Sequence, residues 1–560
     1  MTDPSAPAAA PLDTSAESDP VLSPDQLSRL RSFGSTRATA VGDVLFRAGD
    51  RGLDLIVVEH GCVEIVQAAT PGSADEVARR FRAGQFIGEL NLLTGQTLYV
   101  TGRVTEAGRI TAVSPQDFRR MMATDADLSD LLLRAFMSRR RQLQSGSGAR
   151  AVEIVGSGYS AASLALRSYA ARQQLAHLWF DSDSVAGQSL LAAASLGVAD
   201  LPAVIMPDGV LRRATPGELA GHLGLSYQLV DGEVVDLTVI GAGPAGLAAA
   251  MYGASEGLTT ILLDAVGTGG QAAASSRIEN YLGFPSGLSG VDLTARAAVQ
   301  AEKFGARLFS PCRVVAVQSP GGAVRVSLDD GTTIASRAVV VATGAHYRSL
   351  PLENWKRFEG AGIYYAATEI EANACGKHNV TVIGGANSSG QAALFLASKG
   401  AKVTIAVRRP DIGRDMSAYL VDRLLAHPGV TVRVSTEVTG LRGSEFLETI
   451  TLRDRLTGRS EDQRCSGLFC FIGADPETSW LTGVATDDDG FVLTDAHLTA
   501  ALLPECWAAL GRSPLPFETS VPGVFAAGDV RHSSMKRVAA AVGEGASAIR
   551  SVHQAIGARS

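Results

Sequence analysis

Residues 234–246 read Val-Val-Asp-Leu-Thr-Val-Ile-Gly-Ala-Gly-Pro-Ala-Gly, an apolar, β-branched run that breaks into a glycine-rich turn. Small helix-forming residues follow, and a second apolar run, 260–263, ends in Asp264. A strand, a glycine-rich turn, a helix and a second strand ending in an acid about 20 residues after the glycines are typical of a dinucleotide-binding βαβ unit. The stretch therefore predicts an α/β fold that binds a dinucleotide, with Asp264 accepting a hydrogen bond from a ribose hydroxyl.

Each residue of the turn has a separate physical task. Gly241 permits the tight turn, Gly243 lets backbone N–H groups approach a pyrophosphate, and Gly246 lets the helix pack on the strand. Pro244 and Ala245 open the helix, whose N-terminus offers partial positive charge to the phosphates.

Composition is that of a globular protein with several domains. Of 560 residues, 46% are hydrophobic and 19% are charged. The net charge of −7 argues against a nucleic-acid or membrane partner, and no apolar run reaches the roughly 20 residues that span a bilayer. Residues 1–20 are rich in Ala, Pro, Ser and Asp without an apolar core, which predicts a disordered leader rather than a signal peptide and a cytoplasmic location.

Glycine, proline and polar runs divide the rest of the chain. An N-terminal β-roll with helices is expected at 21–150 and a small α/β segment at 151–230. A two-domain α/β Rossmann-like region should follow, in which 234–350 and 475–560 form one domain and 351–474 is inserted as the other.

The first domain should contain short strands over 45–113, with Gly61 at a turn, and a single long helix from Pro115 to Met137. The run Phe-Ile-Gly-Glu-Leu-Asn-Leu-Leu at 86–93 resembles the phosphate-binding cassette of the cyclic-nucleotide-binding domain. The resemblance implies that the cassette residues Gly88, Glu89 and Leu90 contact the ligand, with the glutamate on the ribose.

One departure from that family stands out. The arginine that pairs with the cyclic phosphate would fall near Leu98, which offers no bidentate guanidinium. Two interpretations stay open: a cyclic-nucleotide site with Arg103 as the substitute cation, or a β-roll kept as an interaction module. No helix-turn-helix follows the domain, which argues against a transcription factor.

The segment 151–230 resembles the thioredoxin/glutaredoxin fold. A helix is expected at 161–172, and Pro202 matches the cis-proline of that family. Ser160 and Ser163 stand where the redox cysteines should open the helix. Because hydroxyls cannot form a disulfide, we expect a spacer or docking module.

The region from residue 234 onward carries further motifs. They are Gly269-Gly270-Gln271, Ile278-Glu279-Asn280-Tyr281, Ala342-Thr343-Gly344-Ala345, Gly523–Val530 and Lys536-Arg537-Val538-Ala539. Together with the first turn they resemble the low-molecular-weight thioredoxin reductases, which implies an FAD/NADPH oxidoreductase.

The resemblance extends the expected FAD site. It places flavin contacts at Gly270, Gln271 and Asn280, the ribityl–pyrophosphate at Asp529, and a helix N-terminus near Arg537 against the isoalloxazine carbonyl, where it would stabilise the anionic reduced flavin. The expected FAD-binding residues are thus Gly241, Gly243, Pro244, Ala245, Gly246, Asp264, Gly270, Gln271, Asn280, Thr343, Gly344, Gly528, Asp529, Arg537, Val538 and Ala539.

A second strand–turn–helix unit lies at 380–398, and the strand after it ends in Arg408-Arg409. Two arginines suit the 2′-phosphate of NADP, whereas an acid would suit NAD. In the turn, Ala386 replaces the approach glycine, which should weaken binding without abolishing it. The expected NADPH-binding residues are Gly384, Asn387, Ser388, Arg408 and Arg409.

Disulfide-reducing members of the family carry a CxxC next to the flavin. The matching stretch here, 362–369, places Ala366 and Glu369 at the two cysteine positions, and neither can accept electrons as a thiol does. Glu369 is the predicted catalytic residue, as a proton relay or a group that tunes the flavin, with an ordinary solvated glutamate as the alternative. The six cysteines, none of them in a CxxC, are expected to be buried free thiols, and no metal site is expected; these cysteines are Cys62, Cys312, Cys375, Cys465, Cys470 and Cys506.

Three functions fit these observations. The first is an NADPH- and FAD-dependent oxidoreductase that passes electrons to a separate protein or small-molecule acceptor. The second is a thioredoxin-disulfide reductase with atypical thiols, and the third is a non-catalytic nucleotide or redox sensor. If the β-roll binds a ligand, that ligand is expected to regulate the enzyme. The family resemblance implies a homodimer.

Overall fold

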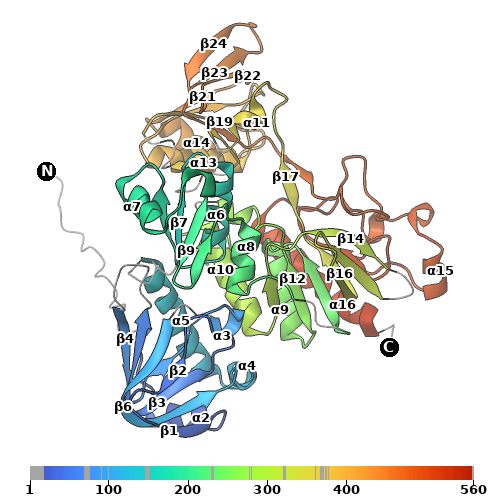
Figure 1. Ribbon diagram of the computed structural model, residues 1–560. Coiled ribbons are helices and arrows are strands. Elements are labelled where there is room, and N and C mark those ends of the chain that lie inside the picture. Colours follow the sequence, from blue (N-terminus) through green and yellow to red (C-terminus); the bar gives the residue numbers. More distant parts are fainter. Residues whose placement is uncertain are drawn as a thin grey trace, which may run out of the picture. The chain divides into compact units, whose positions relative to one another are not determined.

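The computed structural model describes residues 18–67, 76–89, 91–98, 100–145, 152–228, 232–275, 278, 280–319, 323–359, 361–365, 367, 371–372, 375 and 377–557. They form two compact units (Figure 1). The first unit draws on Met1–Gly158, Ala165–Ser226 and Glu302–Gly305, and the second on Tyr159–Leu164, Tyr227–Ala301 and Ala306–Ser560.

The first unit begins with an antiparallel β-roll in which the strand order is β1-β6-β3-β4, with β2 on β6 and β5 on β3. Its strands are β1 (Ser35–Thr39), β2 (Val44–Phe46), β3 (Leu55–Gln67), β4 (Glu76–Arg82), β5 (Phe86–Ile87) and β6 (Val100–Val113). Alternate residues of β3, such as Ile56 and Val58, point into an apolar core. The expected β-roll is confirmed.

The prediction of a turn at Gly61 is wrong. Gly61 lies inside the 13-residue strand β3. Its φ of +91° and the register shifts between β3 and β6 around it mark a bulge. A Cβ atom at Gly61 would lie 2.5 Å from the carbonyl oxygen of Glu106, so glycine is needed at this close approach of the two strands.

The helices of the roll are α2 (Pro24–Arg31), α3 (Asn91–Thr94), α4 (Pro115–Thr124) and α5 (Ala126–Ser145). The single helix predicted from Pro115 to Met137 is wrong, because the chain breaks at Asp125. Asp125 adopts an extended conformation, and its carboxylate accepts a hydrogen bond from the Leu128 N–H at 3.1 Å. The aspartate therefore caps the new helix α5.

The following segment has the strand order β10-β9-β7-β8, with β7 and β8 parallel. Its elements are β7 (Glu153–Gly156), α6 (Ala161–Arg172), β8 (Leu178–Asp181), α7 (Val185–Ala193), β9 (Ala203–Met206), β10 (Gly209–Leu211) and α8 (Pro216–Leu223). The Leu201–Pro202 peptide bond is cis, as expected.

In the second unit, β11 lies in the middle of a seven-stranded sheet, parallel to β12 on one side and β16 on the other. The strands are β11 (Val234–Ile240), β12 (Thr260–Leu263), β13 (Arg307–Phe309), β14 (Val314–Gln318), β15 (Val324–Leu328), β16 (Thr333–Val341) and β27 (Val524–Ala526). The main helices are α9 (Pro244–Ser255), α10 (Gly290–Lys303), the short α15 (Cys506–Leu510) and α16 (Val538–Gly557).

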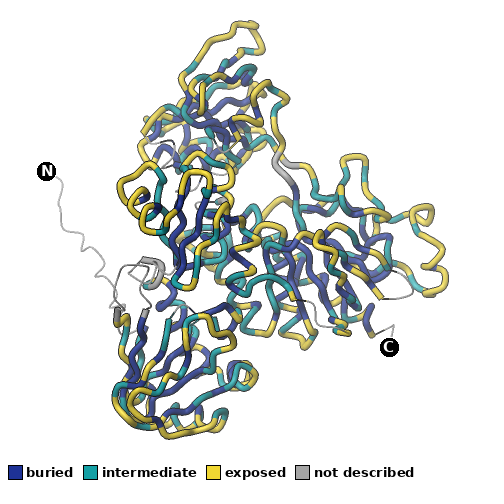
Figure 2. Tube along the Cα trace, in the orientation of Figure 1, coloured by how far each residue is buried: buried dark blue, intermediate teal, exposed yellow. Residues whose placement is uncertain are grey.

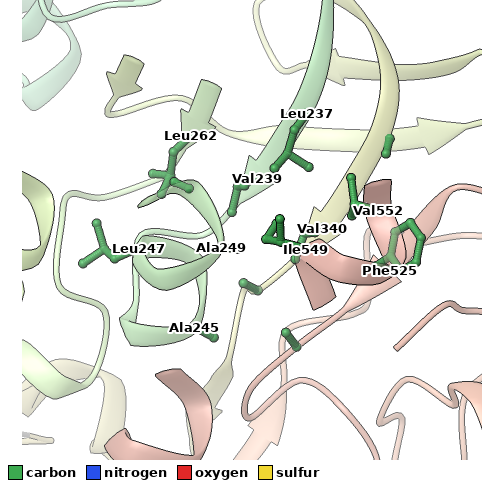
Figure 3. Close-up of a cluster of buried hydrophobic side chains, with 14 of the residues drawn as sticks. Leu237, Val239, Ala245, Leu247, Ala249, Leu262, Val340, Phe525, Ile549 and Val552 are labelled. Carbon is green, nitrogen blue, oxygen red and sulfur yellow. The ribbon is translucent and has the colours of Figure 1, made fainter. Parts of the chain in front are cut away.

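Residues far apart in the sequence build the core beside this sheet. Figure 3 shows side chains of β11 and β16 gathered with those of α9, α16 and β27. A Cβ atom at Gly545 of α16 would lie 2.0 Å from the Ala245 carbonyl oxygen, so the two helices pack at close range. The C-terminal helix is thereby fixed against the helix that follows the first glycine-rich turn.

The inserted part has a parallel sheet with the order β18-β25-β19-β20-β21. Its central strands are buried along nearly their whole length (Figure 2), as helix-covered parallel strands are. The elements are β18 (Ile363–Tyr364), β19 (Asn379–Ile383), α13 (Asn387–Ser398), β20 (Lys402–Ala406), α14 (Ala418–Ala426), β21 (Val430–Arg433) and β25 (Gly467–Cys470).

Smaller elements complete the inserted part. They are the connecting pair β17 (Ala345–Tyr347) and β26 (Ala474–Pro476), α11 (Trp355–Phe358), and the antiparallel sheet β22 (Thr436–Arg442), β23 (Thr449–Asp454) and β24 (Ser460–Arg464). In the part of the chain that the structure describes, no helix combines the length and the apolar character needed to cross a membrane.

Candidate functional site

A cavity of about 230 Å³ lies in the second unit, beside the first residues of α9, α13 and α16. It is lined by Gly241, Gly243, Pro244, Ala245, Asp264, Gly270, Gln271, Ala272, Ser275, Ala342, Thr343, Gly344, Ala345, Ala367, Ser388, Gln391, Ala392, Phe471, Asp529, Lys536, Arg537, Val538 and Ala541. Most of the residues predicted to bind FAD are thus brought to one cavity, together with Ser388 of the second glycine-rich turn.

Glycines shape the wall of this cavity. Gly241 has a φ of +106°, and a Cβ atom there would lie 2.3 Å from the Ala342 carbonyl oxygen. At Gly270 a Cβ atom would lie 2.9 Å from the Cα of Gly243. The two bare backbones therefore form a cradle that side chains would fill, which fits a dinucleotide held by backbone N–H groups.

Gly246 acts from behind the cavity wall. A Cβ atom at this position would lie 1.8 Å from the carbonyl oxygen of Gly241, so any larger residue would force α9 away from β11. This is the packing role that the sequence predicted for Gly246.

Asp264 is held by three backbone donors. Its Oδ2 accepts from the Ala242 N–H at 2.7 Å, and its Oδ1 accepts from the Val266 and Gly267 N–H groups, each at 2.8 Å. A carboxylate oxygen has two lone pairs, so the fixed side chain can still accept from a hydroxyl group. The geometry fits the predicted ribose contact.

Asp529 and the residues just before α16 also line the cavity. Burial raises the pKa of the Asp529 carboxyl, and neighbouring Glu544 raises it further while Lys536 lowers it. The Lys536 ammonium donates to the Asp529 carbonyl oxygen at 2.5 Å and lies 4.1 Å from the centre of the Phe491 ring. Burial lowers the pKa of Lys536. Lys536 therefore braces the Asp529 loop.

Sequence reasoning left several lining residues out of the expected site. Lys536 stood within a quoted motif, so that motif was the available signal for it. Gln391 lies one turn into α13 and Ala541 one turn into α16, positions that helix periodicity could have flagged. Phe471, just after β25, carried no local signal.

The second glycine-rich turn is closely packed. A Cβ atom at Gly384 would lie 2.2 Å from the Phe471 carbonyl oxygen, and the Asn387 side chain accepts from the Ser417 N–H at 2.7 Å. Arg408 and Arg409 are exposed and lie outside the set of lining residues, and Arg409 forms an ion pair with Asp415 at 2.8 Å.

Other predicted residues lie outside the cavity wall. Asn280 and Ala539 are exposed, and Gly528 adopts a φ of +79° beside Ala245. Glu369, the predicted catalytic residue, lies outside the described residues, as do Leu90 and Ala366. Their roles stay predictions.

Three cysteines of the inserted part are buried. Burial raises the pKa of the Cys375 thiol to about 12, with further contributions from Cys465 and Glu371. Burial likewise raises the pKa of Cys465 to about 11 and that of Cys470 to about 12. All three are therefore thiols, not thiolates, at neutral pH.

Five of the six cysteines are buried and free, as predicted, whereas Cys506 is exposed. Cys506 begins the short helix α15, whose Trp507 takes the buried position instead. No cysteine belongs to the described lining of the cavity. Residues 362–369 are the stretch that the sequence resemblance matches to a CxxC, and among its described residues Ala367 lines the cavity.

The cassette of the β-roll is engaged by helix α5. The Arg140 guanidinium forms a bidentate ion pair with Glu89, in which the Nη2–Oε2 distance is 2.7 Å and the second contact joins Nε to Oε1. Arg139 donates to the carbonyl oxygens of Gly88 and Phe86 at 2.7 and 3.0 Å. Both arginines are buried.

The position expected to carry the phosphate-binding arginine is apolar. Leu98 is 6% exposed and belongs to the core of the roll. Arg103, the proposed substitute, is exposed on β6. The cation that pairs with Glu89 is thus Arg140 of α5.

Comparisons with known proteins agree with these observations. Residues 235–545 match the family model described as pyridine nucleotide-disulphide oxidoreductase, and residues 37–125 match that of the cyclic nucleotide-binding domain. The chain is 32% identical to thioredoxin reductase of Streptomyces clavuligerus and 33% identical to that of Streptomyces coelicolor, each over 318 residues that make up 56% of this chain and 92% of the relative.

Solved structures show the same similarity. The crystal structure of T. acidophilum thioredoxin reductase aligns with a TM-score of 0.51 at 27% identity, covering 57% of this chain and 98% of the other. The Lactococcus lactis thioredoxin reductase aligns with the same TM-score at 26% identity, covering 57% and 99%.

Proposed function

The chain belongs to the thioredoxin reductase family of pyridine nucleotide-disulphide oxidoreductases, and on this premise we propose that it passes electrons from NADPH through FAD to an acceptor other than a thiol pair of its own. The observation that carries the proposal is the cavity. Residues of both glycine-rich turns line it, and no cysteine is among its described lining residues.

FAD, when bound, supplies a two-electron carrier between NADPH and the acceptor. The residues that would hold it all line the cavity. The cradle of Gly241, Gly243 and Gly270 would receive the pyrophosphate, and Asp264 a ribose hydroxyl. Asp529, braced by Lys536, would orient the chain that leads to the flavin.

NADPH would bind at the second turn. Ser388 and Gln391 of α13 line the cavity. Arg408 is exposed two residues after β20, where a 2′-phosphate would be recognised. Arg408→Ala should raise the KM for NADPH about tenfold, the worth of one charge-assisted hydrogen bond, and leave the KM for NADH unchanged. Arg414→Ala, at an exposed arginine six residues on, is the matched control; equal loss with NADH would contradict the assignment.

The alternative, a disulfide reductase with atypical thiols, is disfavoured by the chemistry of those thiols. Thiol–disulfide exchange needs an accessible thiolate. Cys375, Cys465 and Cys470 are buried, and their pKa values are raised to between about 11 and about 12. The cysteines of the inserted part are thus structural in this conformation.

The deciding experiment is stopped-flow absorbance of the purified yellow protein. Mixing with NADPH without oxygen should bleach the flavin rapidly. Adding oxidised thioredoxin should then leave it bleached, while an electron-carrier protein, a quinone or oxygen should restore the colour. Recovery that depends on thioredoxin would support the disulfide reductase instead, and no bleaching would favour a sensor.

A further inference from the structure

Three segments that are far apart in the sequence meet beyond the end of strand β20. The first is the pair Arg408-Arg409, which begins two residues after the strand. The second is the corner between β21 and β22, where the Ser435 N–H donates to the Arg409 carbonyl oxygen at 2.9 Å. The third is the turn between β23 and β24, where the Arg455 N–H donates to the Ser435 carbonyl oxygen at 2.8 Å. The backbone of Ser435 thus connects the arginine pair to a turn 47 residues beyond Arg408.

The conformation of Ser435 is fixed by these contacts. Ser435 is buried and has a φ of +50°, in the left-handed region that residues other than glycine seldom occupy. Such a conformation persists only where the surrounding structure determines it. The corner at Ser435 is therefore a defined support for both segments that it contacts.

The side chain of Arg455 makes a second link to the arginine pair. Its Nη1 donates to the Arg408 carbonyl oxygen at 3.1 Å, and its Nε lies 3.4 Å from Oε2 of Glu437. The turn that carries Arg455 is itself fixed, because the Asp454 carboxylate accepts from two of its N–H groups at 2.8 and 2.9 Å. Arg455 therefore holds the backbone of Arg408 from a defined position.

The charges of the three arginines are balanced unequally. Arg409 forms an ion pair with Asp415, and Arg455 forms one with Glu437. Among the described residues, no acidic side chain pairs with Arg408, which is exposed. A guanidinium that is free while its backbone is held suits an anion that accepts two hydrogen bonds, such as a phosphate.

We propose that Arg455 is a positioning residue of the NADPH site: it holds the backbone of Arg408 so that the Arg408 guanidinium is in place before the 2′-phosphate binds. Groups that are ordered in advance lose less entropy on binding, which increases affinity. The 2′-phosphate is the group by which NADPH differs from NADH, so the effect of Arg455 is confined to nucleotides that carry it. The inference rests on the proposed function, which assigns NADPH to this part of the chain.

The test titrates the FAD-loaded full chain with adenosine 2′,5′-bisphosphate and with 5′-AMP in a calorimeter. Arg455→Ala should weaken binding of the bisphosphate about fivefold, the worth of one hydrogen bond, and leave the affinity for 5′-AMP unchanged. Arg453→Ala is the matched control, because Arg453 donates to the same Glu437 at 2.9 Å and the structure shows no bond from it to Arg408 among the described residues. The control should change neither affinity.

A double variant tests whether Arg455 acts through Arg408. Adding Arg455→Ala to Arg408→Ala should cost no further affinity for the bisphosphate. Additive losses would overturn the positioning role, and so would an unchanged affinity of Arg455→Ala where Arg408→Ala weakens binding. Failure of the proposed function is seen separately, as a wild-type flavin that NADPH does not bleach, because the titrations involve no electron transfer.

Discussion

The protonation state of single thiols decides which chemistry this protein can perform. With a pKa of about 12, Cys375 is thiolate to only about one part in 10⁴ at pH 8, and Gly467 packs so closely that a Cβ atom there would lie 2.4 Å from its sulfur. We expect iodoacetamide to label Cys506 first and to leave Cys375, Cys465 and Cys470 unmodified in the folded protein. Peptide mapping by mass spectrometry measures this; labelling of Cys375 at the rate of Cys506 would contradict it.

Glu59 makes the β-roll sensitive to acid. Burial raises its pKa, but hydrogen bonds from Arg31, Thr111 and Arg109 outweigh burial and lower the pKa from 4.5 to about 2. A depressed folded-state pKa contributes stability above the unfolded value, and this contribution is lost as pH falls from about 4.5 towards 2. Its full size is about 3 kcal/mol.

Glu59→Gln should therefore flatten the loss of stability of the roll across this range. Calorimetric unfolding at pH 5, 4 and 3 measures it. Glu106→Gln is the control, because its ion pair with Arg82 is exposed and long, at 3.6 Å. Identical pH profiles for the wild type and Glu59→Gln would refute the assignment.

At the level of elements, helix α5 supplies the hydrogen-bond partner of Glu89 that a ligand would otherwise supply. Glu89 and Arg140 satisfy each other almost out of contact with water, with side-chain exposures of 18% and 9%. Leu98 itself, near the position expected to carry the phosphate-binding arginine, is buried and apolar. Of the two interpretations that the sequence left open, this favours an interaction module.

We therefore expect millimolar cAMP or cGMP to change neither the melting temperature nor the turnover of the full chain. Arg140→Met should destabilise the roll by about 3–5 kcal/mol, because it leaves Glu89 buried without its partner. The double variant Glu89→Gln/Arg140→Met should recover part of that loss in calorimetry. Saturable stabilisation of the wild type by a cyclic nucleotide would contradict this view.

Local patterns made the elements around the site predictable. The strand, turn and helix at 234–255 follow from neighbouring residues. The same local pattern predicts that Gly246 lets the helix pack on the strand. The turn predicted at Gly61 was wrong because a glycine with positive φ suits a turn and a bulge equally. Only pairing with the partner strand decides between them. The break at Asp125 was not predicted because the helical spacing of apolar residues continues across it.

Contacts between distant residues leave no local pattern in the sequence. Arg140 and Glu89 are 51 residues apart, and no local pattern couples them. Phe471 reaches the cavity only because β25 lies beside β19 in the parallel sheet. Such positions depend on topology, which a single sequence reveals only through its family.

At the scale of the whole molecule, the residues that line the cavity all belong to the second unit. A ligand that binds only the folded state stabilises what it binds, by about 2.7 kcal/mol at a hundredfold excess over Kd. We expect added FAD to slow hydrogen exchange in β11 and α9 and to leave β3 and β6 unchanged. Equal protection of the β-roll strands would show that the two units share one cooperative transition.

The absence of a cysteine from the described cavity lining also affects how the protein responds to oxidants. Peroxide oxidises an exposed, reactive active-site cysteine to sulfenic, then sulfinic, then sulfonic acid. The last two steps are usually irreversible. The described lining residues of the cavity, Ala367 among them, offer peroxide, heavy metals and electrophilic drugs no such thiol. Electron flow through this protein should therefore continue under oxidant loads that poison thiol-dependent reductases.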